Sequence, residues 1–294
     1  MLQRLVVILF IPLNVYCMLN GVTDNWNDHS HLIKIFSRSL PSSDPIACSG
    51  SLITPRLILT STDCVNENGN TMSDIIVSIP RSGDKSSLVK KAQHIEDMGT
   101  ISLLRLDHPL PLNELCPQGV SSNRMSSLLL SPSLTKSSIL QFEWDKLDTT
   151  VCRMIAFNTT ENVADFTRTT AVSRADDIVA EVNDDFLDVS RTDMKSATPC
   201  FEDPGAPLEC MIGDHYIQIG NEKTTKSSSP SPSTTRSARV EMKKNEKSSL
   251  SRCSSSSLIR FSRLDMDRLS SLIQQHDFSG LIRSFELCKK EEKN

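Results

Sequence analysis

The chain has 294 residues and a formal net charge of −4 at pH 7, which excludes the strongly basic composition typical of nucleic-acid-binding proteins. Its length allows one large β-domain or two small domains. Residues 1–17 combine Arg4 with an apolar run from Leu5 to Leu13, and end at Cys17. This pattern predicts a cleaved signal peptide over 1–17. Since no other apolar run approaches membrane length, we expect no membrane span and a secreted, extracellular protein.

The cysteine content agrees with an oxidising compartment. Nine cysteines are present, and loss of Cys17 with the signal peptide leaves eight, an even number suited to disulfides. The count alone leaves their pairing open.

Short apolar runs bounded by Pro, Ser, Asn and Asp predict β-strands over 51–61, 74–80, 100–110 and 216–220. Helical spacing occurs only towards the C-terminus, from about Leu264 to Leu287. The pattern therefore predicts an all-β chain with one terminal helix. Residues 223–256 are rich in Ser, Thr, Lys and Pro, and we expect a disordered insertion because they have too few apolar side chains to form a core.

Two segments carry a resemblance to a known family. Residues 48–64 read CSGSLITPRLILTSTDC, and residues 200–210 read CFEDPGAPLEC. They resemble the two hallmark segments of the trypsin/chymotrypsin family of serine proteases. The resemblance covers about 18–288 and implies two packed six-stranded antiparallel β-barrels, over about 18–135 and 136–288, closed by a C-terminal α-helix. It puts the acidic stretch 176–193 where that family carries variable loops.

The resemblance also implies a disulfide framework. The expected pairs are Cys48–Cys64, Cys152–Cys210, Cys200–Cys253 and Cys116–Cys288.

The catalytic residues of that family are not retained at the matching positions. Asp63 stands in place of the base histidine, Thr100 in place of the orienting aspartate, and Pro204 in place of the nucleophilic serine. His94 matches a family histidine outside the triad, and Asp97 is out of register for the orienting role. A misalignment of one or two residues is the alternative at each position, and the flanking cysteines and prolines oppose it at Asp63 and Pro204.

Two supporting positions differ as well. Glu202 replaces the glycine that lines the oxyanion hole, and Thr198 occupies the position that determines specificity for basic residues. Because the mechanism needs a nucleophile, a base and oxyanion donors together, the resemblance implies an inactive homologue with no cofactor.

Other candidate sites are weaker. His29 and His31 alternate as metal ligands on a strand would, but no third ligand is evident, and we interpret them as surface histidines. Lys243, Lys244 and Lys247 are either solvated charges of a linker or contacts for anionic glycans or membranes. The sequon at Asn158 predicts N-glycosylation, and the Ser/Thr-rich insertion suits O-glycosylation.

Three functions remain open. The favoured hypothesis is a secreted, non-catalytic protease homologue that binds a protein partner: a protease, an inhibitor or a surface ligand. The alternatives are a serine-type endopeptidase with unconventional residues and a glycosylated extracellular structural component.

The first prediction concerns the N-terminus. Residues 18–21, MLNG, resemble the terminus that activation cleavage frees in that family, and they follow the proposed signal cleavage at Cys17. We predict that signal cleavage alone produces a Met18 terminus without a zymogen step. Asp203 then pairs either with the Met18 amino group or with local backbone N–H groups. N-terminal sequencing of the secreted protein should begin at Met18. A start well beyond it, or a second form made by a trypsin-like cut, would contradict this.

Overall fold

The computed structural model describes residues 18–19, 22–24, 29–38, 46–67, 69–79, 87–115, 147–157, 172–184, 186–191, 198–199, 204–213, 215–222 and 259–283. Several sequence predictions lie outside the described residues: the signal peptide, Asn158, Glu202, Asp203, the pairs Cys200–Cys253 and Cys116–Cys288, and the insertion 223–256 with its lysines.

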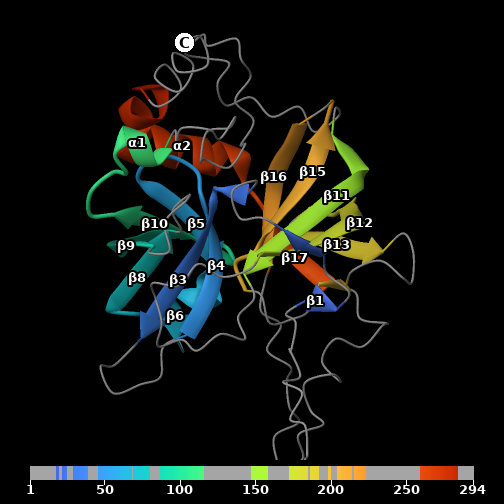
Figure 1. Cartoon of the computed structure of the whole chain (residues 1–294), viewed down its shortest axis with the longest axis horizontal. Helices are drawn as coiled ribbons and strands as arrows, with labels where there is room; N and C mark the ends of the chain where they lie inside the picture. The colour runs from blue at the N-terminus through green and yellow to red at the C-terminus, as the bar shows by residue number, and fades with distance from the viewer. Residues whose placement is uncertain are drawn as a thin grey trace, which may run out of the picture.

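Six strands in the N-terminal half form a closed antiparallel barrel. They are β3 (Leu32–Arg38), β4 (Ile46–Leu52), β5 (Leu57–Ser61), β8 (Asp74–Ile79), β9 (Leu88–Met98) and β10 (Ile101–Leu106). The barrel closes in the order β10–β5–β4–β3–β8–β9 (Figure 1). β5 is buried over its whole length because it packs in this barrel and also contacts β16 of the second barrel.

Six later strands form a second closed barrel beside the first (Figure 1). They are β11 (Asp148–Phe157), β12 (Val172–Val182), β13 (Phe186–Arg191), β15 (Pro207–Ile212), β16 (His215–Glu222) and β17 (Ile259–Arg263). The order is β11–β15–β16–β17–β13–β12, and β12 pairs back with β11. The predicted fold class, two six-stranded antiparallel barrels with a C-terminal helix, is confirmed.

Several short strands and single helical turns lie outside the twelve barrel strands. β2 (Val22–Asp24) extends the second barrel's sheet by pairing with β12. β1 (Met18–Leu19) pairs with β14 (Thr198–Pro199), and β6 (Asn66–Glu67) pairs with β7 (Asn70–Thr71). η2 (Thr62–Cys64) is a single 3-10 turn, and α1 (Leu112–Leu115) is a single helical turn. The N-terminal strands β1 and β2 thus lie on elements of the C-terminal half.

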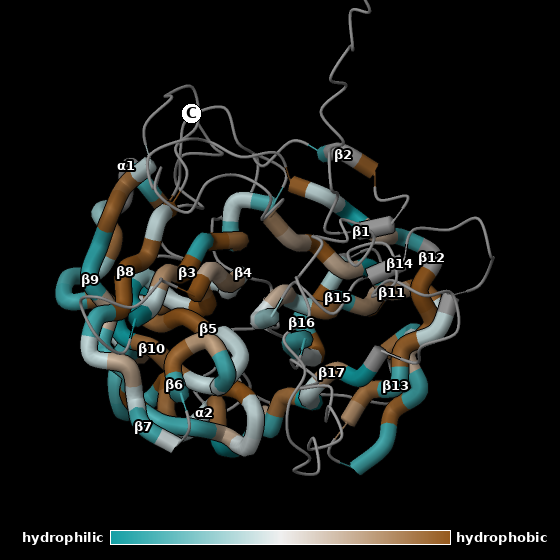
Figure 2. Tube along the Cα trace, turned by 90° about the horizontal axis from the view of Figure 1, so that it is seen from below, coloured by the Kyte–Doolittle hydropathy of each residue, from teal (hydrophilic) through white to brown (hydrophobic). Residues whose placement is uncertain are grey.

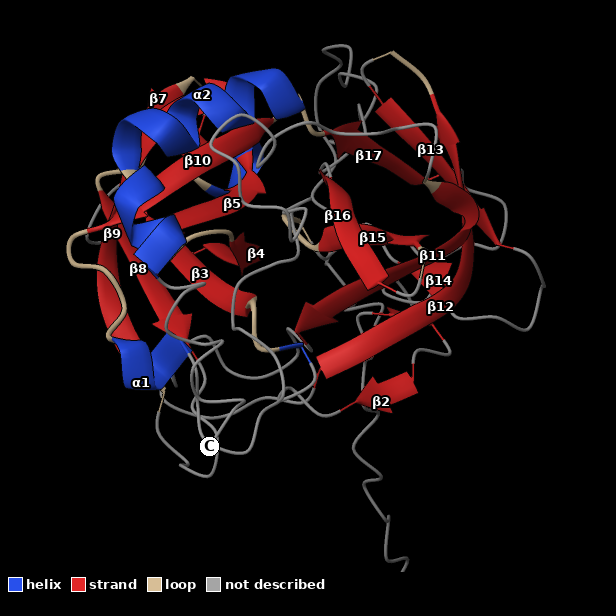
Figure 3. Ribbon diagram, turned by 90° about the horizontal axis from the view of Figure 1, so that it is seen from above, coloured by secondary structure: helices blue, strands red, loops and turns tan. Residues whose placement is uncertain are grey.

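The C-terminal helix crosses back to the first barrel. α2 (Met266–His276) begins at Asp265, whose side chain accepts the Arg268 backbone N–H, and residues 278–283 continue as helix. Figure 3 shows α2 lying over β5 and β10. Its apolar face joins the first barrel's core through Leu269, Leu272 and Ile273, and the flanking residues Leu264 and Leu281 join the same core.

The acidic stretch 176–193 is not a variable loop, so that expectation was wrong. Most of it forms β12 and β13, joined by a short turn. Ile178, Ala180, Leu187 and Val189 lie in the second barrel's core, and Glu181 and Asp188 are among the residues that alternate with them. Alternation with a period of two is the signature of a half-buried strand, and here it outweighs the acidic composition. Figure 2 shows the same recurrence of hydrophobic residues along strands of both barrels.

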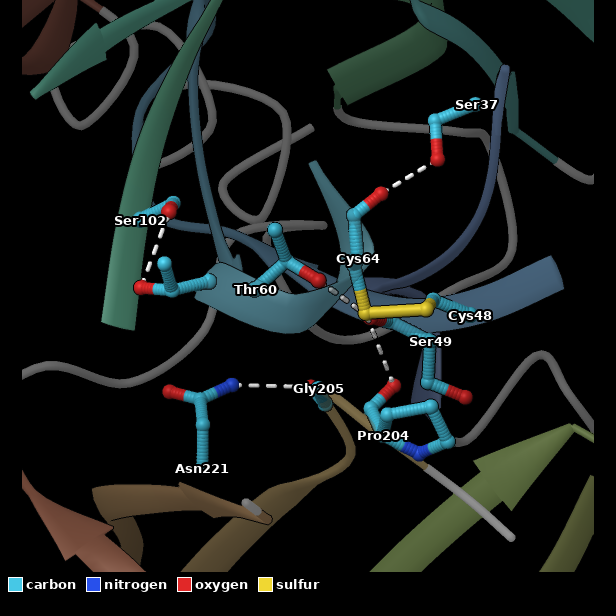
Figure 4. Close-up of a disulfide and its surroundings, with 10 residues drawn as sticks. Ser37, Cys48, Ser49, Thr60, Cys64, Ser102, Pro204, Gly205 and Asn221 are labelled. Atoms are coloured by element: carbon cyan, nitrogen blue, oxygen red, sulfur yellow. Dashed lines mark hydrogen bonds between the residues drawn. A yellow bond between two sulfur atoms is a disulfide. The ribbon is translucent and has the colours of Figure 1, made fainter. Parts of the chain in front are cut away.

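The two barrels meet in close backbone contact where the chain enters β15. The Ser49 N–H of β4 donates to the Pro204 carbonyl at 3.0 Å, and the Thr60 hydroxyl of β5 donates to the Ser49 carbonyl at 2.8 Å. Gly205 follows with φ +83°, and its carbonyl accepts Asn221 Nδ2 at 2.8 Å (Figure 4). A Cβ on Gly205 would overlap the Ser49 carbonyl oxygen and the Thr60 hydroxyl. Only glycine fits this conformation and this space together.

The second prediction tests that junction. Gly205→Ala should destabilise the protein by roughly 2–5 kcal/mol, because left-handed strain adds to an overlap with the first barrel. The matched control is Gly99→Ala, where φ is +67° and open space surrounds the Cβ position, so only about 1–2 kcal/mol of strain applies. Denaturant unfolding with intact disulfides measures both values. Equal losses in the two variants would show that the close approach at Gly205 is unimportant.

Candidate functional site

The hallmark segments of the sequence meet at the barrel junction. Asp63 lies half-buried in η2, directly before Cys64, and Cys64 forms a disulfide with Cys48 of β4. The Cys64 Sγ lies 3.6 Å from the Pro204 carbonyl oxygen. The disulfide therefore holds the Asp63 turn against the chain that carries Pro204 (Figure 4).

Thr100 lies at the same junction, in the turn between β9 and β10. Its carbonyl accepts the Thr62 N–H at 2.9 Å, which places it beside the Asp63 turn. Its hydroxyl contacts the Ser262 hydroxyl of β17, so it also joins the two barrels. The elements that carry Asp63, Thr100 and Pro204 are therefore brought together.

These three side chains lack the groups that acyl transfer requires. Pro204 carries no hydroxyl or thiol, so it has no nucleophile, and its carbonyl already accepts the Ser49 N–H. Thr100 offers a hydroxyl where the mechanism needs a buried carboxylate to orient an imidazole. Asp63 is a carboxylate that contacts no acid or imidazole among the described residues. In the part of the site that the structure describes, Asp63, Thr100 and Pro204 can form contacts and hydrogen bonds, but they do not form a nucleophile–base pair.

A serine, a histidine and an aspartate do cluster elsewhere on the first barrel, but in the wrong order for catalysis. Asp97 is the hub: Oδ1 lies 2.7 Å from His94 Nε2 and also accepts from Ser102, while Oδ2 accepts Asn66 Nδ2 at 2.8 Å. In a catalytic triad the histidine stands between serine and aspartate. Ser102 is also fully buried, and its hydroxyl contacts Thr62, so this cluster fixes the η2 turn to β10.

The strongest electrostatic feature is a buried carboxylate that sequence reasoning missed. Glu209 of β15 is 3 % exposed, and its oxygens lie 2.8 Å from His31 Nε2 and 2.8 Å from Arg153 Nε. The Arg153 guanidinium stacks on the Tyr216 ring at 3.8 Å. The signal available in the sequence was one glutamate inside the otherwise apolar run PLEC.

The environment of Glu209 determines its ionisation. Burial raises its pKa, but the attraction and hydrogen bonds of His31 and then of Arg153 outweigh burial and hold the pKa at about 2. Glu209 is therefore ionised at all physiological pH values. Because His31 directly precedes β3 of the first barrel, its contact with Glu209 is a second link between the barrels.

The interpretation of His29 and His31 as surface histidines was wrong. They are 1 % and 8 % exposed, since the chain at 29–31 packs between the barrels. His29 contacts Asp24 and His31 contacts Glu209, so each ring is engaged by a carboxylate. Among the described residues, no group of three or more His, Cys, Asp or Glu side chains is arranged to hold a metal ion.

Two disulfides of the expected framework are present: Cys48–Cys64 in the first barrel and Cys152–Cys210, which joins β11 to β15 in the second. Thr198, which the sequence predicts at the specificity-pocket position, lies in β14, whose backbone pairs with Met18 and Leu19 of β1. Within the described ranges, no helix is long and apolar enough to cross a membrane.

In comparisons with known proteins, no protein-family model matches the chain, and no curated protein matches its sequence. The two barrels and the disulfides are consistent with a trypsin-like fold.

The third prediction follows from the Glu209 ion pair. A carboxyl whose pKa falls on folding contributes stability above its ordinary pKa of 4.5, and this contribution is lost as pH falls towards 2. The shift corresponds to roughly 3 kcal/mol. Glu209→Gln should therefore lower the free energy of unfolding near neutral pH by a few kcal/mol, since it also leaves Arg153 without its carboxylate.

Urea unfolding across pH checks this, and the difference from wild type should shrink between pH 4.5 and 2. Glu67→Gln, at an exposed glutamate, is the matched control and should change little. A constant deficit at every pH would mean that Glu209 acts through packing and not through its charge.

Proposed function

We propose that the chain is a secreted, non-catalytic homologue of trypsin-like serine proteases that acts by binding a protein partner. Pro204 is the observation that carries this proposal. It occupies the nucleophile position of a retained hallmark segment, and its carbonyl is hydrogen-bonded into the barrel junction. Without a nucleophile at that position, the mechanism of the family has no first step.

The rigid scaffold around the η2 turn supports a function that depends on the surface of the protein. The junction at Gly205, the Cys48–Cys64 disulfide and the Asp97 cluster all hold the η2 turn in place, although the turn carries Asp63 in place of a base. A rigid arrangement that persists without its chemistry is suited to recognition of proteases, inhibitors or surface ligands. The disulfides suit an extracellular compartment.

The fourth prediction concerns catalysis. The purified protein should cleave no peptide ester or amide, and no serine-directed phosphonate should label it. Asp63→His with Pro204→Ser should remain inactive, because Thr100 would leave the new histidine unoriented and Glu202 would keep a negative side chain at the oxyanion position.

The matched comparison adds Thr100→Asp and Glu202→Gly to that double variant. Phosphonate labelling of the fourfold variant alone would support the assignment of all four positions. Turnover by wild type would overturn the proposed function. Turnover by the double variant would overturn the roles given to Thr100 and Glu202. Circular dichroism of each variant verifies that the barrels are intact.

Binding is tested separately. The protein is immobilised, and purified trypsin-like proteases and their protein inhibitors are passed over it, with and without residues 223–256. Binding that survives the deletion assigns recognition to the barrels. Loss of all binding on deletion would favour the alternative, a structural component in which the insertion is the active part.

A further inference from the structure

The C-terminal helix is interrupted at Asp277, where it lies on the first barrel. α2 ends at His276, Asp277 has φ −159° and ψ 30°, outside the helical range, and residues 278–283 form the helical turns that follow. Backbone bonds continue across the interruption, because the Asp277 N–H donates to the Ile273 carbonyl and the Asp277 carbonyl accepts the Leu281 N–H. Leu281 is buried in the first barrel's core. The end of the helix is therefore docked and not free in solvent.

A side-chain hydrogen bond ties the interruption to the first barrel. The Thr54 hydroxyl, in the turn between β4 and β5, donates to Asp277 Oδ2 at 2.6 Å. The same hydroxyl oxygen accepts the backbone N–H groups of Arg56 at 3.1 Å and Leu57 at 2.9 Å. A threonine hydroxyl has two lone pairs and one hydrogen, so both lone pairs are used and the hydrogen goes to Asp277. Asp277 has only to accept this bond, and a neutral carbonyl oxygen can do the same.

Gly280 provides the space for the Asp277 carboxylate. A Cβ at position 280 would lie 2.3 Å from Asp277 Oδ1. The carboxylate is thus enclosed between the helix backbone at Gly280 and the buried Thr54, and Asp277 is half-buried. Enclosure removes water from a group that is ionised at neutral pH, and this costs free energy unless neighbouring donors and cations compensate.

The compensation at Asp277 is incomplete. Burial raises the pKa of this carboxyl above its usual 3.8, and the Thr54 hydrogen bond and the Arg56 charge and N–H oppose the rise without cancelling it. The Arg56 guanidinium is engaged elsewhere, since it donates to the Leu106 and Asp107 carbonyls. The other charged or titratable side chains that the packed elements carry near the interruption are Asp107, His108, His276 and Arg283.

We propose that Asp277 is a charge-sensitive hinge, which loosens the last part of the C-terminal helix when its carboxyl is ionised. In the closed state Asp277 accepts the Thr54 hydrogen bond and Leu281 lies in the core. In the open state residues 277–283 leave the barrel and the carboxylate is solvated. Opening exposes the core surface that Leu281 covers, whereas the apolar face of α2 stays docked.

The direction of the pH effect follows from burial. In the open state the carboxyl lies in water and has its ordinary pKa of 3.8, while the closed state has the higher pKa. The closed state therefore binds the proton more tightly. Its extra stability is fully present below pH 3.8 and is lost as pH rises through the raised pKa. Each unit of difference between the two pKa values changes the equilibrium between closed and open states about tenfold.

Hydrogen–deuterium exchange of the intact secreted protein tests the hinge. Asp277→Asn keeps an acceptor for Thr54 and has no charge, so amides of 278–283 should exchange more slowly than in wild type at neutral pH, by roughly 2–10-fold. Asp267→Asn is the matched control, because Asp267 is an exposed aspartate in the first turn of the same helix. It should not slow exchange at 278–283. Equal or faster exchange in Asp277→Asn would overturn the proposal, since the charge would then hold the helix end closed.

The pH dependence provides a second test. As pH is lowered from about 7 towards about 4, protection of 278–283 should rise in wild type, after correction for intrinsic exchange, and should stay constant in Asp277→Asn. A rise of the same size in the variant would overturn the proposal.

A measurement on wild type alone covers the case in which Asp277→Asn fails to fold. In carboxyl-carbon NMR, the Asp277 carboxyl should titrate with a midpoint above 3.8. A midpoint at or below 3.8 would overturn the proposal. The result is independent of the proposed binding function, since none of these measurements involves a partner.

Discussion

The close backbone approach at Gly205 is the constraint on which the rest of the structure depends. With no Cβ in the way, the chain entering β15 lies directly on β4 and β5, and Pro204 reaches the Ser49 N–H and the Cys48–Cys64 disulfide. The Ser49–Pro204 and Thr62–Thr100 hydrogen bonds are made by backbone atoms, and Cys48 and Cys64 are joined by the disulfide. These contacts do not depend on the chemistry of the side chains at positions 63 and 204.

β15 is attached to the first barrel twice, by contacts of opposite physical character. At its start the attachment is steric and follows from the missing side chain of Gly205. Four residues later it is electrostatic, through the contact of Glu209 with His31, while Arg153 of the second barrel contacts the same carboxylate. The first is insensitive to pH and salt, whereas the second depends on the charge of buried groups. The same strand thus gives the junction both a steric contact at Gly205 and a charged contact at Glu209.

The apolar pattern and the family resemblance were sufficient to predict the architecture. They were not sufficient to predict which charged side chains are buried between the barrels. The apolar runs predicted β5, β8, β10 and β16 in place, and helical spacing predicted α2. The acidic composition of 176–193 led to the wrong prediction of a variable loop. The alternation of buried apolar residues with a period of two was the better indicator of strands. The burial of His31 could not be predicted, since its carboxylate partner Glu209 lies far along the chain and only the packed barrels bring the two together. The Thr100–Ser262 contact, across 162 residues, has the same origin.

The position of α2 has a consequence for biosynthesis. The core of the first barrel includes Leu269, Leu272, Ile273 and Leu281, which are translated after every strand of both barrels. The first barrel therefore cannot complete its apolar core while these residues remain in the ribosomal exit tunnel, although its own six strands emerge early. Its nascent form exposes the surface that α2 later covers, so the core of the first barrel is completed only after the strands of the second barrel have been synthesised.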